Sequence, residues 1–149
     1  MTSIHASCVA MGNHGILIRG APGSGKSELC LQLIDAEGYG LGRKALRARL
    51  VADDQVELQR QGKKLVARAP ASLAGLIEIR GAGILSSTYK KSVTLKLVVD
   101  LLPPTQVERL PDQADQQIEI EGVKLARIAI ATGNPAITAI VRSALQYLV

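Results

Sequence analysis

The stretch GAPGSGKSEL, residues 20–29, constrains the fold of this chain more than any other part of the sequence. It fits the pattern G-x-x-x-x-G-K-[ST], in which backbone N–H groups close round a phosphate. Glycine lets the loop turn those groups inward without steric cost. The pattern needs a strand before it and a helix after it, and GILIR (15–19) and ELCLQLI (28–34) supply both. The sequence therefore predicts a nucleoside triphosphate site.

Each part of this loop has its own expected role. The helix that follows adds the positive end of its dipole to the phosphate site. Lys26 is expected to neutralise the outer phosphates, and the Ser27 hydroxyl is expected to bind Mg²⁺. The residues that we expect to contact the nucleotide are Gly20, Ala21, Pro22, Gly23, Ser24, Gly25, Lys26 and Ser27.

Length and composition limit the class of protein. The 149 residues are enough for one domain with a single sizeable core. No apolar run approaches the ~20 residues of a membrane span, and no signal peptide is evident, so we expect a cytoplasmic protein away from membranes. Cys8 and Cys30 have no metal-type spacing and are expected to be reduced, buried thiols.

The charge is basic overall and unevenly placed. The formal net charge is +5, and residues 43–68 hold eight basic residues against three acidic ones, whereas residues 108–121 hold five acidic residues against one arginine. The basic segment is compatible with a solvated face or with an acidic protein partner. Nucleic acid is not expected as a partner, because the only aromatic residues are three tyrosines and stacking platforms are nearly absent.

Hydrophobic patterning predicts an α/β fold with a mixed sheet and few helices. Many of the expected strands are joined by hairpins, unlike those of an all-parallel doubly wound fold. The expected strands are 4–11, 15–19, 50–54, the hairpin 56–69 turning at 61–63, 77–81, 94–102, and a strand pair within 117–131 turning at 121–122. The expected helices are 27–38 and a C-terminal helix that Asn134 caps and that Pro135 begins.

A phosphate loop needs an acidic partner, and two strands offer one. LVADD brings Asp53 and Asp54, and LKLVVD brings Asp100, which could also simply end its strand. The pattern alone does not choose between these strands. Adjacent carboxylates repel each other unless a cation is near. If both lie at a strand end, they point in different directions, so one can face the nucleotide while the other anchors the loop.

A third acid lies in LIEIRGAGIL. Alternation along a strand puts Glu78 and Arg80 on one face and Ile77 and Ile79 on the other. A carboxylate and a guanidinium followed by glycines suit a surface that binds metal and phosphate. A solvent-facing ion pair on an edge strand is the alternative.

The segments IHASCVAM, GILIRGAPGSGKSEL, LVADDQVEL and LIEIRGAGIL, in this order, resemble the kinase domain of bacterial HPr kinase/phosphorylase. The last segment is similar to the signature stretch of that family. Weaker similarity continues through TLKLVVDLL and VERL to the final helix, so the resemblance covers nearly the whole chain. It implies a single catalytic domain, residues 1–149, with a fold similar to that of HPr kinase and PEP carboxykinase. The resemblance begins only at the kinase domain, so we expect a short form of the family that lacks the usual N-terminal domain.

The resemblance also implies an activity. Members of the family use ATP to phosphorylate a serine of HPr, the small phosphocarrier protein of the sugar phosphotransferase system, and many also remove that phosphate. Carried over by position, Lys26 binds the outer phosphates, and Ser27 and Glu78 hold Mg²⁺. Members of the family tend to form hexamers, so a homo-oligomer is implied.

Three further positions match catalytic residues of the family. Asp54 matches the position of the family's general base, which takes the proton of the serine. His5 falls where the family keeps its active-site histidine, and Arg109, in VERL, where the family has a catalytic arginine. A carboxylate within reach of the hydroxyl is expected on chemical grounds as well, because serine is a weak nucleophile.

Two departures from the family pattern leave other functions open. A basic insertion at residues 38–49 could touch an acidic partner or cover the nucleotide, although a solvated loop is the default. Where the family has a loop with arginines linked to dephosphorylation, this chain reads IAIATGNPAI, so kinase activity is expected and phosphorylase activity stays open. The alternatives are a nucleotide-sensing module that binds ATP and a partner without efficient transfer, and a small-molecule kinase that uses the insertion as its lid.

Overall fold

Three parallel strands form the centre of the fold. The computed structural model describes residues 1–149, and in it β9 (Val93–Leu102) lies between β3 (His14–Gly20) and β11 (Val123–Ala131), parallel to both. All other strand pairs are antiparallel. The sheet is therefore mixed, as the hairpin-rich sequence predicts.

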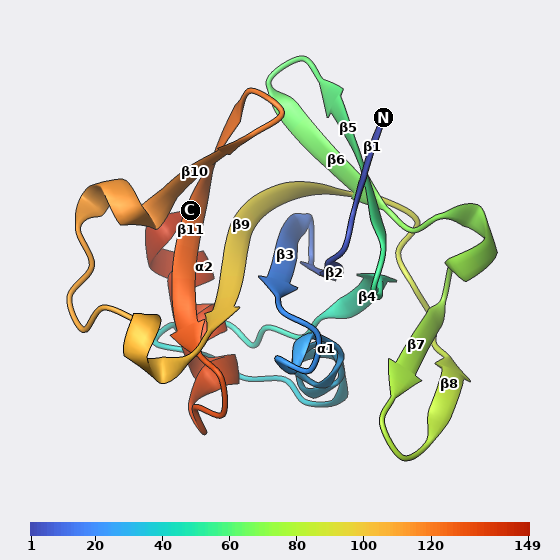
Figure 1. Ribbon diagram of the computed structural model, residues 1–149, viewed down its shortest axis with the longest axis horizontal. Coiled ribbons are helices and arrows are strands. Elements are labelled where there is room, and N and C mark those ends of the chain that lie inside the picture. The colour runs from blue at the N-terminus through green and yellow to red at the C-terminus, as the bar shows by residue number, and fades with distance from the viewer.

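The remaining strands extend this centre on both sides (Figure 1). The main sheet runs β1-β5-β6-β9-β3-β2-β4, with β11 added to β9 and β10 added to β11, while β7 and β8 form a separate hairpin. The bounds are β1 Thr2–Ile4, β2 Ser7–Met11, β4 Arg49–Ala52, β5 Val56–Gln61, β6 Lys64–Arg68, β7 Leu76–Ile79, β8 Gly83–Ser86 and β10 Gln117–Ile120. Three short 3-10 helices complete the chain, at Ala71–Leu73, Pro104–Gln106 and Gln113–Gln116.

Alternation along β3 divides the core into two clusters. Ile16 and Ile18 point to the side of the helices, whereas Leu17 points to the opposite face, and all three side chains are fully buried. A strand that is buried on both faces reads as a continuous apolar run. The GILI run that precedes the phosphate loop thus belongs to one of the three central strands, and the end of this strand fixes where the loop begins.

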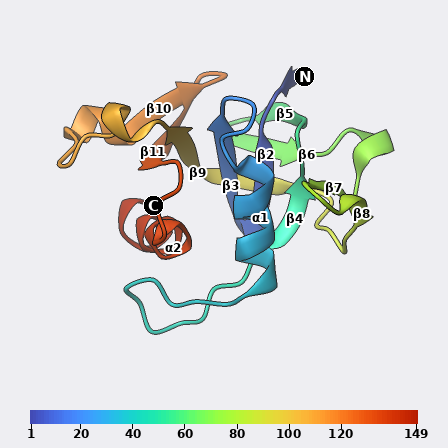
Figure 2. The ribbon, with the colours of Figure 1, turned by 60° about the horizontal axis from the view of Figure 1, so that its bottom comes forward.

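Both helices lie on the same side of the sheet (Figure 2). α1 (Lys26–Asp35) begins directly after the phosphate loop, and α2 (Ile137–Leu148) packs beside it. Their apolar faces meet the sheet through a shared cluster that includes Leu29, Leu33 and Val141. No helix in the chain combines the length and apolar character needed to cross a bilayer.

The predicted strands and hairpins are largely confirmed, with three differences. A break after Ile4 separates β1 from β2, so the expected strand 4–11 is two strands. β8 was not expected, because its four residues are exposed and carry no buried alternation. Asp100 does not end its strand, since β9 continues to Leu102.

Both helices are shorter at one end than predicted. α1 ends at Asp35 rather than Gly38. α2 begins at Ile137, with Ala136 as its N-cap, so the expectation that Pro135 begins the helix is wrong. The Asn134 side chain does accept a hydrogen bond from the Ala136 N–H at 2.9 Å, but it closes the turn before the helix instead of the first helical turn.

The basic insertion is held to the C-terminal helix by hydrogen bonds. The buried Arg142 of α2 donates hydrogen bonds to the carbonyls of Leu46 (3.1 Å) and Ala36 (2.5 Å). Gln146 donates to the carbonyl of Tyr39 at 2.6 Å. The basic side chains of the insertion remain exposed. The expectation of a solvated loop therefore holds for the basic side chains, which face solvent. The backbone of the loop is instead held against α2 by hydrogen bonds.

Candidate active site

The phosphate loop has the backbone shape that its glycines predict. Gly23 and Gly25 have φ angles of 80° and 97°, in the left-handed region that favours glycine. Gly25 is also the N-cap of α1, so the loop passes directly into the first turn of the helix. The unsatisfied N–H groups of that turn and the helix dipole both favour an anion at this point.

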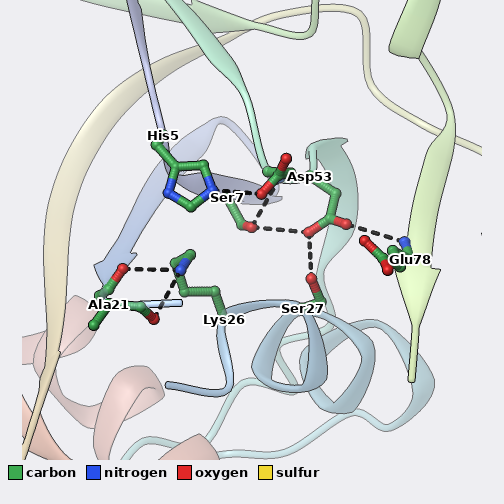
Figure 3. Close-up of polar contacts among 9 residues, drawn as sticks. His5, Ser7, Ala21, Lys26, Ser27, Asp53 and Glu78 are labelled. Carbon is green, nitrogen blue, oxygen red and sulfur yellow. Dashed lines mark hydrogen bonds and ion pairs between the residues drawn. The ribbon is translucent and has the colours of Figure 1, made fainter. Parts of the chain in front are cut away.

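Lys26 lies folded over the loop. Its Nζ donates to the carbonyl oxygens of Gly20 (2.8 Å) and Ala21 (3.2 Å), and only 7% of the residue is exposed. The ammonium group is held over the cradle that the loop forms (Figure 3). It has no carboxylate partner within ion-pair distance. The positive charge is therefore available to an incoming phosphate.

The Asp53 carboxylate is the centre of a hydrogen-bond network (Figure 3). Its Oδ1 accepts from the hydroxyls of Ser27 (2.7 Å) and Ser7 (2.9 Å), and its Oδ2 accepts from the Glu78 N–H (3.0 Å). The residue is 6% exposed, and every donor in the network is neutral. A buried carboxylate without a cationic partner favours a cation nearby. Since Ser27 gives its proton to Asp53, the lone pairs of its oxygen can face such a cation.

Asp54 points away from that network. Its φ of 67° is unusual for a residue other than glycine, and it turns the side chain toward His5. The Asp54 Oδ1 lies 2.6 Å from His5 Nε2, and both side chains are more than half exposed. The two adjacent carboxylates therefore point in different directions, as expected, whereas the expectation that one of them faces the nucleotide stays a prediction.

The hairpin of β7 and β8 brings Glu78 and Arg80 to the same site. Ile77 is buried under the hairpin, while Glu78 and Arg80 are exposed on the other face, as the alternation predicts. Both side chains line a cavity of about 260 Å³ together with His5, Lys26 and Asp54. Ser27 and Glu28 also line it. The structure thus brings together five of the six residues that the sequence predicts for metal binding or catalysis.

The cavity holds no hydrophobic lining residue. Ligand sites usually present mostly apolar walls, so this hollow suits charged groups such as phosphates and a cation better than an adenine ring. It contains the acidic Glu28, Asp54 and Glu78 beside the basic Lys26 and Arg80. The charges of the lining residues therefore suit a ligand that combines phosphates with a cation.

Arg109 is the predicted residue that does not reach this cavity. It lies in the segment between β9 and β10 and lines a separate hollow of about 450 Å³, together with Asp115 and Arg127. The arginine that does line the cavity is Arg80. The alternation of LIEIRG with its flanking glycines is the sequence signal for Arg80.

Asp100, the other acidic candidate, belongs to an ion-pair cluster. It accepts two hydrogen bonds from Arg19, at 2.7 and 2.8 Å, and one from Arg127 at 2.8 Å. Burial raises the pKa of Asp100, but the hydrogen bonds and charges of the two arginines outweigh burial and hold that pKa below its ordinary value. The carboxylate is fully occupied, so it is not the acidic partner of the phosphate loop.

The cysteine near the site is inert. Burial, and to a smaller extent the charge of Asp53, raises the pKa of the Cys30 thiol well above its ordinary value. Burial likewise raises the pKa of Cys8. Both thiols are free and fully buried, as predicted, and a neutral buried thiol is no nucleophile.

A mixed sheet in which one of the central parallel strands leads into a glycine-rich loop and a helix, with carboxylates beside the loop, is typical of a nucleotide-binding domain. Comparison with known proteins gives the family. Residues 1–148 match the HPr Serine kinase C-terminal domain. The chain belongs to this family, and the resemblance seen in the sequence is confirmed.

Similar proteins support the assignment. The HPr kinase/phosphorylase of Limosilactobacillus reuteri is 35% identical over 97% of this chain and 46% of its own length. That of Burkholderia lata is 33% identical over 86% of this chain and 39% of its own length. The chain therefore spans less than half the length of these relatives.

A solved structure supports the fold. The Hpr(Ser) kinase/phosphatase from Coxiella burnetii superposes with a TM-score of 0.78, covering 98% of this chain and 95% of that one, at 23% sequence identity. The predicted fold, a mixed sheet with few helices like that of HPr kinase, is thereby confirmed.

Proposed function

We propose that this protein is an ATP- and Mg²⁺-dependent kinase that phosphorylates a serine of the phosphocarrier protein HPr. The observation that carries the proposal is the joint placement of Lys26, Ser27 and Glu78 with Asp54 around one polar cavity. Membership of the family and the names of the relatives support the choice of HPr as substrate.

The residues fit a magnesium ion that is shared with phosphates. Mg²⁺ is usually bound by one or two carboxylates, waters and substrate phosphates instead of an all-protein cage. No group of three or more His, Cys, Asp or Glu residues forms such a cage here, whereas the Ser27 hydroxyl and the Glu78 carboxylate line the cavity. These two residues would hold the ion. When bound, it would neutralise charge on the outer phosphates.

Asp54 is the proposed general base. Its Oδ1 is engaged by His5 Nε2, which leaves Oδ2 to accept the proton of an incoming serine hydroxyl. Its exposed fraction allows a protein substrate to reach it. Lys26 and Arg80 lie beside the same cavity, where they can stabilise charge on the transferred group. The serine oxygen forms the new bond to phosphorus as the bond to ADP breaks.

Phosphotransfer to HPr tests the proposal. The protein is incubated with γ-labelled ATP, Mg²⁺ and HPr, and in parallel with an HPr whose acceptor serine is replaced by alanine. Label on wild-type HPr alone is the expected result. A stable complex of protein, ATP and HPr without label would instead support a nucleotide-sensing module. Labelling of neither HPr, without a complex, would contradict both functions.

We further propose that the protein acts as a homo-oligomer, as family membership implies. The basic segment 43–68 and the acidic segment 108–121 offer complementary charge for contacts between copies. Sedimentation of the purified protein at low and high salt tests this. A monomer at all concentrations in low salt would contradict it.

A further inference from the structure

One hydroxyl touches both members of the Asp53–Asp54 pair. Ser7, on β2, is fully buried, and its Oγ donates to Asp53 Oδ1 at 2.9 Å. The same oxygen accepts a hydrogen bond from the Asp54 N–H at 3.3 Å. The hydroxyl proton is thus used on Asp53 (Figure 3), and a lone pair of the same oxygen is used on the Asp54 N–H.

The two aspartates belong to opposite sides of the site. Asp53 holds the Ser27 hydroxyl and the Glu78 N–H, so it sets the side where a metal and the phosphates would bind. Asp54 carries the proposed base and meets His5. Ser7 is therefore the side chain that links the metal side to the proton-accepting side.

The backbone of Asp54 needs such support. A left-handed conformation is costly for a residue other than glycine, and it persists only where the surroundings hold it. Here both of its peptide groups are bound by the segment that follows His5: Ala6 N–H donates to Asp54 O at 3.2 Å, and Asp54 N–H donates to Ser7. The contacts that hold the turn thus come from Ala6 and Ser7, the two residues that directly follow its histidine partner.

We propose that Ser7 is a positioning residue for phosphoryl transfer, which fixes the Asp54 carboxylate relative to Ser27 and Glu78. This inference rests on the proposed function. Ser7 does not line the cavity and acts only through the two aspartates. Replacing its hydroxyl leaves the Asp54 N–H without a partner and removes a donor from Asp53. Small displacements of catalytic groups are costly to the rate, by as much as about 100-fold for 1 Å.

Ser7→Ala tests the proposal against Val9→Ala as a matched control. Val9 is fully buried two positions further along the same strand and on the same face, but it contacts no residue of the network by hydrogen bonding. Both variants remove buried atoms from β2. If Ser7 had only a structural role, two variants with similar losses of thermal stability would therefore show similar losses of kcat.

Two measurements decide the outcome. The first is the kinetics of transfer from Mg-ATP to HPr, where Ser7→Ala is expected to lower kcat by roughly tenfold or more with little change in KM for ATP. The second is NMR of the imidazole rings, because the chain has only two histidines, His5 and His14. Ser7→Ala is expected to move the ring signals of His5 and to leave those of His14, the first residue of β3, in place.

The NMR measurement does not depend on the proposed function. If the wild-type protein transfers no phosphate to HPr, the proposed function fails, while the His5 signals still report whether Ser7 positions Asp54. Unchanged His5 signals in Ser7→Ala would overturn the inference, as would an equal loss of kcat in Val9→Ala. Should Ser7→Ala not fold, the nearly isosteric Ser7→Cys, a weaker hydrogen-bonding group, is expected to show the same changes at smaller size, and their absence would overturn the inference.

Discussion

His5 Nε2 and Asp54 Oδ1 lie 2.6 Å apart, although the exposed fractions of the two side chains are 51% and 60%. Exposed pairs of this kind contribute little to folding, about 0–1 kcal/mol. Since the contact adds so little to the free energy of unfolding, we attribute it to a role in catalysis. In this account, His5 orients the Asp54 carboxylate so that its second oxygen faces the incoming hydroxyl.

Replacing His5 by alanine should therefore separate activity from stability. We expect His5→Ala to lower the rate of transfer by about tenfold or more, because orientation of the base is lost. The free energy of unfolding should change by less than about 1 kcal/mol. Initial rates and thermal unfolding measure the two effects. His14→Ala, at the exposed first residue of β3, is the control and should change neither quantity. A loss of rate that only follows a loss of folded protein would contradict this role.

Lys26 should control nucleotide affinity. Its Nζ lies over the loop and makes contact with Gly20 O and Ala21 O, so a bound phosphate would be within its reach. Hydrogen bonds to a charged group contribute about 1.5–3 kcal/mol, which corresponds to roughly 10- to 150-fold in affinity. We expect Lys26→Ala to weaken Mg-ATP binding by that factor in titration calorimetry. Lys44→Ala, on the exposed insertion, should bind normally. Unchanged affinity in Lys26→Ala would exclude the loop as the phosphate site.

The Arg19–Asp100–Arg127 cluster should make stability depend on acid pH. The pKa of Asp100 is lower in the folded protein than its ordinary value, so its contribution is complete above the unfolded-state pKa of about 3.9 and is lost as the pH falls through the folded-state pKa. Asp100→Asn should lower the free energy of unfolding by about 3 kcal/mol at pH 7, since it leaves the partly buried arginines unpaired.

Urea unfolding at pH 7 and pH 3 checks this. The difference between wild type and Asp100→Asn should shrink at pH 3, which lies below the ordinary pKa of an unfolded-state aspartate. Asp112→Asn, an exposed carboxylate without an ion-pair partner, should have little effect at either pH. A difference of the same size at both pH values would show that the charge of Asp100 is not what stabilises the cluster.

Arg142 should hold the insertion in place. Because its guanidinium binds the carbonyls of Leu46 and Ala36, Arg142→Gln should release residues 38–47 from α2. We expect trypsin to cleave after Arg43 and Lys44 several-fold faster in this variant, because opening of a local segment governs its cleavage. Arg109→Gln, an exposed arginine outside the segment, is the control. Equal cleavage rates would mean that the insertion is held by other contacts.

The sequence predicts the parts of the site that local patterns determine. The phosphate loop follows from glycine spacing and a flanking apolar strand. The opposite directions of Asp53 and Asp54 follow from their adjacency at a strand end, and the shared face of Glu78 and Arg80 follows from strand alternation. These patterns depend on neighbours within a few residues, so they can be read without knowledge of the fold.

The long-range contacts could not be predicted in the same way. Ser7 contacts Asp53 and Asp54 because β2 pairs with β4, and nothing in the residues around Ser7 indicates that pairing. Arg142 lies about a hundred positions from the insertion that it holds, and a single arginine on a helix has no distinguishing pattern. The separation of Arg109 from the cavity likewise depends on the path of the irregular segment after β9.

The most direct test of the account is the transfer rate of Asp54→Asn. Asparagine keeps the size of the side chain and tolerates the left-handed backbone of this position, so the variant removes the base with little other change. Transfer of labelled phosphate from ATP to HPr and Mg-ATP affinity are measured on the same sample. We predict that transfer falls by roughly 100-fold or more while affinity stays within about twofold. Transfer at the wild-type rate would contradict the account, because no proton acceptor at Asp54 would then be needed.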